Sequence, residues 1–156
     1  MQRNAGAEPW RWLTVVAYVA MVAMNALANT LPLFGNTTAD VSRSYPTLFT
    51  PAPFTFSVWG VIYAGLAAFA VYQALPAQRD DPRLAVARPL FVLSSALNVG
   101  WLTAWHADAI ALSEVVMVAL LLCLIALYTR VRAWREPATS ASRWLLDVPF
   151  SLYLGW

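Results

Sequence analysis

Long apolar stretches alternate with short polar connectors along most of the chain. Four of these stretches, over residues 12–31, 54–75, 87–105 and 110–131, are long enough to cross a bilayer as helices at about 1.5 Å per residue. A fifth runs from Leu145 to Trp156, and as a helix it would span only about 18 Å of a hydrocarbon core of about 30 Å. We therefore expect an all-α membrane protein, a bundle of five transmembrane helices with the fifth truncated at the C-terminus.

Helix-breaking residues mark the connectors between these stretches. The connection around His106–Asp108 is very short, which predicts a tight antiparallel hairpin of the third and fourth helices. No soluble domain separates the apolar stretches, so residues 1–156 are expected to form one transmembrane domain that is incomplete at its C-terminus. The breakers are Pro32, Gly35, Pro46, Pro51 and Pro53 in the first connector, Pro76, Pro82 and Pro89 in the second, and Pro137 in the fourth.

Composition supports a membrane protein and excludes several other classes. The chain is 60% hydrophobic and 12% charged, whereas soluble domains have about 45–50% apolar and about 25% charged residues. Cys123 is the only cysteine, so a disulfide framework and a multi-cysteine metal site are both excluded. The arginines lie between apolar segments and form no basic stripe, which disfavours nucleic acid as a partner. The expected partner is the lipid bilayer.

The distribution of arginines predicts the orientation of the helices. Nine arginines fall on one side of the predicted bundle, and only Arg43 falls on the other. Because positively charged loops stay in the cytoplasm, we expect a cytoplasmic N-terminus in a bacterial inner membrane. Residues 13–28 also resemble a signal peptide, so cleavage of the first helix remains an alternative. The nine are Arg3, Arg11, Arg79, Arg83, Arg88, Arg130, Arg132, Arg135 and Arg143.

One face of the third predicted helix combines a polar amide with large rings. Ser94, Asn98, Trp101 and Trp105 recur at helical spacing. An amide exposed to lipid tails would be costly, so this face should point into the bundle or into a cavity. The alternative is that Asn98 only joins helices through a hydrogen bond, and the spacing leaves both open.

The first two predicted helices carry similar faces. Phe56, Trp59 and Tyr63 form an aromatic stripe in the second helix, and Tyr18, Asn25 and Asn29 share a face of the first. Aromatic stripes at helical spacing are more often packing than ligand contacts. Polar groups among large rings on three helices nevertheless predict one mostly apolar pocket with a few orienting groups. A small-residue stripe, Gly60, Ala64 and Ala68, favours close helix packing and permits a homodimer.

Other polar and aromatic residues have simpler interpretations. His106 and Asp108 are expected to be solvated at the membrane surface, Glu114 to cap the fourth helix, and Asp147 to pair with Arg143. No nucleophile–base pair or phosphate loop is present, which disfavours hydrolytic and phosphoryl-transfer enzymes. Four tryptophans at predicted membrane boundaries are expected to anchor the protein at the interface, namely Trp10, Trp12, Trp134 and Trp144.

Four short motifs stand near the starts of, or within, the predicted helices. Residues 57–63 read Ser-Val-Trp-Gly-Val-Ile-Tyr after two prolines, and residues 96–101 read Ala-Leu-Asn-Val-Gly-Trp. Residues 111–114 read Ala-Leu-Ser-Glu, and residues 149–150 read Pro-Phe. In order and spacing these motifs resemble those of the TspO/MBR family of tryptophan-rich sensory proteins, which includes the mitochondrial translocator protein, or peripheral benzodiazepine receptor. That family has Val-Trp-x-x-Leu-Tyr, Leu-Asn-x-x-Trp, Ala-Leu-x-Asp and Pro-Tyr at these places.

The resemblance implies a five-helix membrane protein that binds porphyrins and other flat or sterol-like hydrophobic molecules. A lid formed by residues 36–53 would cover the pocket, and Trp59, Asn98 and Trp101 would line it. Trp105 and His106 stand where the family usually has two phenylalanines. Tyr153 stands where it usually has a tryptophan implicated in porphyrin breakdown, which disfavours a porphyrin-modifying enzyme.

These observations favour a non-enzymatic receptor or sensor for a hydrophobic, tetrapyrrole-like ligand. The alternatives are a transporter of small hydrophobic molecules and a light- or oxygen-dependent porphyrin-modifying enzyme. We expect no catalytic residue, no metal and no required cofactor, a porphyrin or haem-type molecule being the ligand. The predicted ligand-binding residues are Trp59, Tyr63, Asn98, Trp101, Trp105 and Tyr153.

Overall fold

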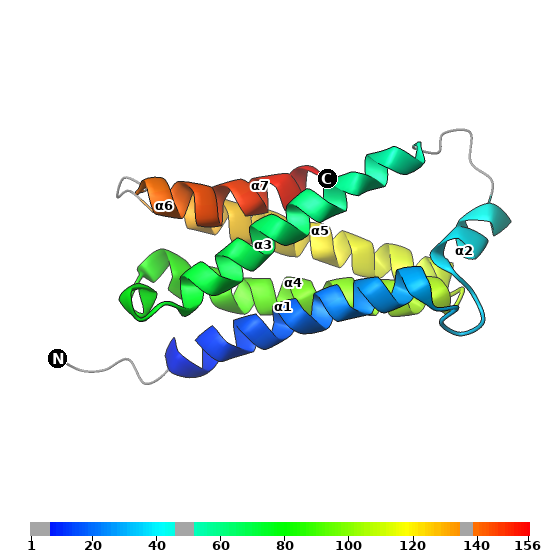
Figure 1. The fold of residues 1–156 in the computed structure, drawn as a ribbon, viewed down its shortest axis with the longest axis horizontal. Helices are drawn as coiled ribbons and strands as arrows, with labels where there is room; N and C mark the ends of the chain where they lie inside the picture. Colours follow the sequence, from blue (N-terminus) through cyan, green and yellow to red (C-terminus); the bar gives the residue numbers. More distant parts are fainter. Residues whose placement is uncertain (1–6, 46–51, 135–138) are drawn as a thin grey trace.

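The regular elements of this computed structural model are all helical (Figure 1). It describes residues 7–45, 52–134 and 139–156. Arg3, Pro46, Pro51, Arg135 and Pro137 lie outside the described residues, as does part of the expected lid. The elements are α1 (Ala7–Thr30), α2 (Thr38–Ser44), η1 (Pro53–Ser57), α3 (Val58–Ala74), η2 (Pro76–Gln78), α4 (Pro82–His106), α5 (Ile110–Arg132), α6 (Ser140–Ser142), η3 (Arg143–Asp147) and α7 (Val148–Gly155).

Four of the described segments are long and apolar enough to cross a membrane. They are Glu8–Thr30, Phe54–Ala74, Pro82–His106 and Ile110–Arg132. Their outward surfaces carry many exposed aliphatic side chains, for example Val16, Val71 and Val115, as expected where lipid replaces water. The chain is therefore an all-α membrane protein. The C-terminal segment of α6, η3 and α7 packs against α3 and α5, and Figure 1 shows it running alongside them.

The third membrane-crossing helix, α4, begins earlier than predicted. Asp81 caps it by accepting hydrogen bonds from the backbone N–H groups of Arg83 and Leu84, and Pro82 occupies the first turn. Pro89 was expected to break the second connector but lies inside α4. Proline removes only one backbone donor, and burial of the flanking residues, including Ala87, holds the helix together. The prediction of a break at Pro89 is wrong for this reason.

The α4–α5 hairpin matches its prediction, because the two helices make extensive contact along their lengths. Asp108 turns the chain between them with a φ of 57°. Deeper in the bundle, the rings of Phe69, Phe91 and Phe150 pack edge to face with centroid distances of 4.8–5.8 Å. These three residues join α3, α4 and α7 into one core, with ring geometry that such contacts favour.

Close packing of α3 on α7 depends on Gly65. A Cβ built at Gly65 would lie 3.3 Å from the Cβ of Pro149, whereas one at Gly60 would meet open space. The helix contact therefore uses Gly65 rather than the predicted stripe that begins at Gly60. A homodimer through that stripe stays a prediction. The close approach at Gly65 also brings the start of α3 near the end of α7.

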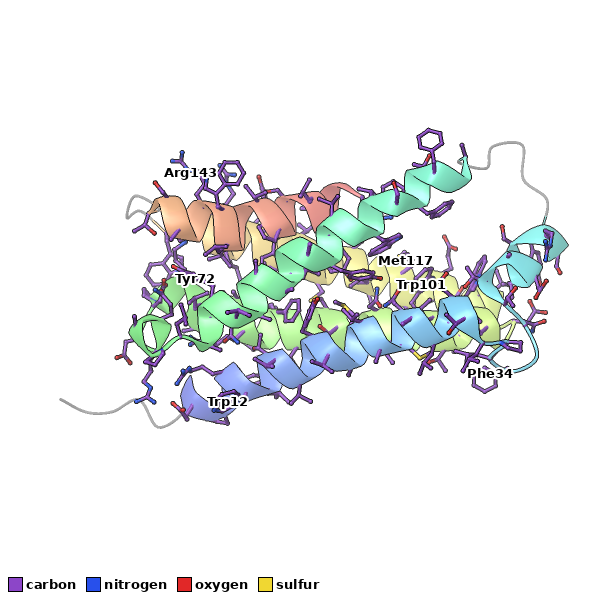
Figure 2. The ribbon with its side chains drawn as sticks, in the orientation of Figure 1. Trp12, Phe34, Tyr72, Trp101, Met117 and Arg143 are labelled. Carbon is purple, nitrogen blue, oxygen red and sulfur yellow. The ribbon has the colours of Figure 1, made fainter. Side chains whose placement is uncertain are left out.

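One end of the bundle, which we call the arginine-rich end, gathers the start of α1, the α3–α4 connection, and the facing ends of α5 and α6. Its contacts include Arg83, which pairs with Asp147 and donates to Ser142 Oγ at 3.0 Å. The predicted pair of Asp147 with Arg143 is wrong. Arg83 reaches Asp147 across helices, whereas Arg143 projects outward and is exposed (Figure 2).

A buried hydrogen-bond network closes this end of α3. Arg88 is fully buried and donates from Nε to Gln73 Oε1 at 3.0 Å, and from Nη2 to Gln73 O at 3.0 Å and Gln78 O at 2.8 Å. Arg11 donates to Ala74 O. The guanidinium groups thus satisfy carbonyl oxygens at the C-terminus of α3, which carry the negative end of the helix dipole. The network ties α1, α3 and α4 together.

Candidate ligand-binding site

Trp59 is the centre of an aromatic cluster formed by η1, α3, α7 and the residue that follows α7. Its ring stacks on Tyr63 with centroids 5.4 Å apart and an interplanar angle of 24°. It meets Tyr153 edge-on at 6.0 Å and Trp156 edge-on at 6.4 Å, and Phe56 in turn contacts Trp156 at 6.1 Å. We call these five residues the Trp59 cluster. Their spacing is that of favourable aromatic pairs.

A chain of polar side chains borders this cluster on the inside of the bundle. Asn25 donates to Asn98 Oδ1 at 2.7 Å, and Asn98 donates from Nδ2 to the hydroxyl of Tyr153 at 3.3 Å. Asn98 is fully buried, and Asn25 and Tyr153 are less than a tenth exposed. The helical face of Asn98 therefore points into the bundle, as its burial cost predicts. These hydrogen bonds connect α1, α4 and α7 next to the aromatic rings.

A second polar contact links α1 to the same cluster. The hydroxyl of Tyr18 donates to the backbone carbonyl of Tyr63 at 3.1 Å. Tyr18 thus contacts the backbone of the residue whose ring stacks on Trp59. The first helix contributes to the cluster's surroundings from two positions, Tyr18 and Asn25, which share the predicted face.

The predicted site residues do not all meet. Trp59, Tyr63, Asn98 and Tyr153 lie together, but no ring pair joins Trp101 or Trp105 to this group within the part of the chain that the structure describes. Both tryptophans are partly buried on α4, and Trp101 lies toward the α2 end of the bundle (Figure 2). The Nε1 of Trp105 is buried without a hydrogen-bond partner among the described residues.

Two members of the cluster, Phe56 and Trp156, were not predicted as site residues. Their exposed fractions are 48% and 45%, so the cluster reaches the outer surface of the bundle at these rings. The signal for Trp156 was its spacing of three residues from Tyr153, which puts both rings on one helical face. Which face of α3 would meet that pair could be decided only by the packing of α3 on α7.

The described part of the expected lid fastens to the α4–α5 turn. Asn36 Nδ2 donates to His106 O at 3.2 Å, Thr38 Oγ1 lies 3.2 Å from His106 Nε2, and Tyr45 donates to Asp108 Oδ1 at 3.0 Å. The Tyr45–Asp108 hydrogen bond raises the pKa of the Tyr45 hydroxyl. These contacts hold the start of the lid against the end of the bundle that carries α2.

Two expectations for this end are wrong. His106 is fully buried rather than solvated, with Nδ1 2.8 Å from Leu102 O and Nε2 3.1 Å from Ala28 O. The approach of α2 and the end of α1 covers its ring. Glu114 is exposed and lies outside the first turn of α5, because α5 begins one turn earlier at Ile110. The N-cap residue of α5 is Ala109, which makes no side-chain hydrogen bond.

The short helix α2 starts with a reciprocal cap that responds to pH. Hydrogen bonds from the side chain and backbone of Thr37, followed by that from Arg43, lower the pKa of Asp40 from 3.8 to about 2. A carboxyl with a lowered pKa stabilises the folded form above its ordinary pKa, and this contribution is lost as pH falls through about 2.

We therefore expect a carbon-13 NMR titration of labelled aspartates to show Asp40 titrating near pH 2. Thr37→Val should move this titration toward 3.8, because it removes the hydrogen bond that the Thr37 hydroxyl donates to Asp40 Oδ2, the main cause of the lowered pKa. Thr30→Val, whose hydroxyl contacts only α1 carbonyls among the described residues, is the matched control. Titration of Asp40 near 3.8 in the unmodified protein would contradict the cap.

The described residues offer no metal centre. Within residues 7–45, 52–134 and 139–156, no group of three or more His, Cys, Asp or Glu side chains is placed to hold a metal ion. The arrangement around Trp59 instead offers flat ring faces, one buried amide and one buried hydroxyl. Such a surface can stack against a planar apolar molecule and orient it by a few hydrogen bonds.

The fold and the cluster define an all-helical membrane protein with an aromatic, amide-bordered candidate site. Residues 11–156 match the family of TSPO-like proteins. The chain therefore belongs to the TspO/MBR family, as its four motifs indicate. No curated protein and no solved structure matches it significantly.

Proposed function

We propose that this protein is an integral membrane receptor or sensor that binds a flat hydrophobic ligand of the tetrapyrrole type at the Trp59 cluster. The observation that carries the proposal is the meeting of Trp59, Tyr63 and Tyr153 with the buried amide of Asn98. Ligand sites of this kind are mostly apolar and use few polar groups for orientation. Membership of the TspO/MBR family supports the same ligand class.

The rings of the cluster pack against one another with centroid distances of 5.4–6.4 Å, so a ligand that stacks on Trp59 would take the place of one of them. Trp156 is the candidate, because it is about half exposed whereas Tyr153 is almost completely buried. A planar ligand would then stack on Trp59 in place of the edge-on contact that Trp156 makes now. Stacking on Trp59 would keep the core packing of Tyr153 intact.

The polar side chains beside the cluster would orient the ligand. The amide of Asn98 has two N–H groups, and the described residues provide an acceptor for one of them, the hydroxyl of Tyr153. The second N–H could bond an acceptor atom at the rim of the ligand. Because the amide is fully buried, such a bond would be worth more than the same bond at the surface.

A receptor fits the described residues better than a transporter or an enzyme. A transport path needs polar groups through the full membrane depth, and α5 is aliphatic from Val115 to Leu127. An enzyme that modifies porphyrin would need reactive indoles around the ligand, and Tyr153 replaces the expected tryptophan beside Trp59.

The proposed topology has a fifth membrane segment and a cytoplasmic N-terminus in a bacterial inner membrane. The α6–η3–α7 segment lies within the bundle against α3 and α5, which supports its assignment as the fifth segment. Arg83 and Arg132 line one cleft, and Arg11 contacts the end of α3, which supports a cytoplasmic arginine-rich end. Labelling of Ser44→Cys and Ala141→Cys variants with a membrane-impermeant thiol reagent would show on which side of the membrane each end of the bundle lies.

Titration of the detergent-solubilised protein with protoporphyrin, followed by tryptophan fluorescence, tests the proposal. We expect saturable quenching, and about fivefold weaker binding for Trp59→Leu, because one aromatic stacking partner contributes about 1 kcal/mol beyond its buried area. Trp12→Leu is the matched control, since Trp12 is 59% exposed at a membrane boundary far along the chain from the cluster.

Absence of saturable quenching in folded protein would contradict a tetrapyrrole receptor. Equal weakening by Trp59→Leu and Trp12→Leu would place binding outside the cluster. Loss of the porphyrin absorption band under illumination, seen only with Trp59 intact, would instead favour the enzymatic alternative. Uptake of protoporphyrin into liposomes that contain the protein would favour transport.

A further inference from the structure

A cleft of about 370 Å³ opens at the arginine-rich end, between the C-terminal end of α5 and the η3–α7 segment. Its polar lining includes Arg83, Arg132, Arg143 and Asp147. A neighbouring cavity of about 560 Å³ shares Arg83 and Trp134 with it. The cleft shares no described lining residue with the Trp59 cluster: Val148 and Ser151 line the cleft, whereas Tyr153 and Trp156 of the cluster come later in the chain.

The four charged side chains of the cleft have different roles. Arg83 and Asp147 neutralise each other in an ion pair whose side chains are 11% and 17% exposed. Arg132 and Arg143 are exposed at the rim, and no ion pair engages either one within the described residues. Among the described lining residues, the cleft therefore carries two positive charges that lie outside the Arg83–Asp147 ion pair.

One of these two arginines is already held in place. Arg132 donates from Nη1 to the hydroxyl of Tyr128 at 3.1 Å, and its guanidinium carbon lies 5.3 Å from the centre of the Tyr128 ring. These contacts use one N–H group and one face of the guanidinium. The remaining N–H groups can donate to an anion without loss of the contact.

Apart from Ser151, whose hydroxyl donates to the backbone carbonyl of Asp147 at 2.7 Å, the rest of the lining is apolar or amphipathic. Val131, Val148 and Trp134 line the same cleft. Trp134 and Trp144 are 42% and 67% exposed, as expected at the level of lipid headgroups. A ligand at this place would meet positive charge on one side and hydrocarbon on the other.

We propose that this cleft binds the phosphate headgroup of an anionic membrane phospholipid. Arg132 and Arg143 donate to the phosphate oxygens, and Arg83 stays paired with Asp147 beneath them. Arginine suits phosphate because its planar N–H groups match two oxygens at once. Inorganic phosphate shares this chemistry, but the apolar wall of Val131 and Val148 favours a ligand that carries acyl chains.

Native mass spectrometry of the detergent-solubilised full chain tests the proposal with phosphatidylglycerol and phosphatidylcholine as probes. We expect saturable binding of phosphatidylglycerol that is clearly tighter than binding of phosphatidylcholine. Each of Arg132→Gln and Arg143→Gln should weaken phosphatidylglycerol binding by about fivefold, and the double variant by about 25-fold. Excess inorganic phosphate should leave most of the lipid bound.

Arg130→Gln is the matched control, because Arg130 is an exposed arginine of the same helix end that does not line the cleft. It should change the binding by less than about twofold. The pair Arg132→Lys with Arg143→Lys keeps both charges and should retain the preference for phosphatidylglycerol. Thermal unfolding of each variant in the same detergent reports whether the fold is intact.

Three results would overturn the proposal. Equal binding of the two lipids would show that the net negative charge of the headgroup does not determine the contact, because both lipids carry a phosphate and acyl chains. Equal weakening by Arg130→Gln would show a diffuse effect of surface charge. Full displacement of the lipid by inorganic phosphate would show that the cleft takes the free anion rather than a phospholipid.

Discussion

Arg88→Met is expected to lower the free energy of unfolding by about 3 kcal/mol or more. The substitution removes donors that now satisfy Gln73 Oε1 and the backbone carbonyls of Gln73 and Gln78. Buried acceptors left without donors cost about 1–3 kcal/mol each, and a methionine side chain can fill the volume but donate nothing. The loss should appear as a lower midpoint of denaturation in mild detergent.

Arg88 is fully buried and contacts only neutral acceptors among the described residues, so the sign of the change shows whether its hydrogen bonds outweigh the desolvation of its charge. Its described hydrogen-bond partners are the Gln73 amide oxygen and carbonyl oxygens at the end of α3 and in the following connection. Arg130→Met, at an exposed position, should shift stability by less than about 0.5 kcal/mol. An Arg88→Met protein as stable as the unmodified one would mean that desolvation of the guanidinium cancels its hydrogen bonds.

Asn98→Leu is expected to affect both stability and ligand binding. It removes the acceptor for Asn25 and the donor to Tyr153, and it leaves two buried polar groups with fewer partners. We expect a loss of about 2 kcal/mol in the free energy of unfolding. Protoporphyrin should bind about tenfold more weakly, because the buried orienting amide is gone.

The measurements are denaturation in detergent and the fluorescence titration. Asn29→Leu is the comparison, since Asn29 donates to the Asn25 backbone carbonyl and is exposed. Reduced stability with unchanged porphyrin affinity in Asn98→Leu would show that this amide only joins helices. That outcome would select the packing interpretation of Asn98 over ligand contact.

The helices and their order follow from local features of the chain. A run of apolar residues long enough to span a bilayer must satisfy its own backbone hydrogen bonds, and a helix achieves this within the segment. The short link at His106–Asp108 permits only an antiparallel hairpin, and the structure has one. The separation of Arg43 from the other described arginines follows in the same way, because the helices alternate in direction.

Side-chain partners were harder to predict, because they depend on elements distant in the sequence. The charge of Asp147 is matched by Arg83 on another helix rather than by Arg143 one turn away. His106 stands at a helix end, where solvation is typical, but α1 and α2 cover it. Pro89 remains helical because neighbouring helices bury the turn around it.

The tryptophans show most clearly which features follow from the sequence and which depend on the packing of the helices. Helical spacing alone places Asn98 and Trp101 on one broad face of α4 and makes Trp59 part of an aromatic stripe. Only the close packing of α3 on α7 at Gly65 brings Trp59 to Tyr153 and Trp156 and leaves Trp101 and Trp105 outside that group of rings. Periodicity determines which residues share a face of one helix. The rotation of each helix, and therefore what that face meets, is set by contacts between helices.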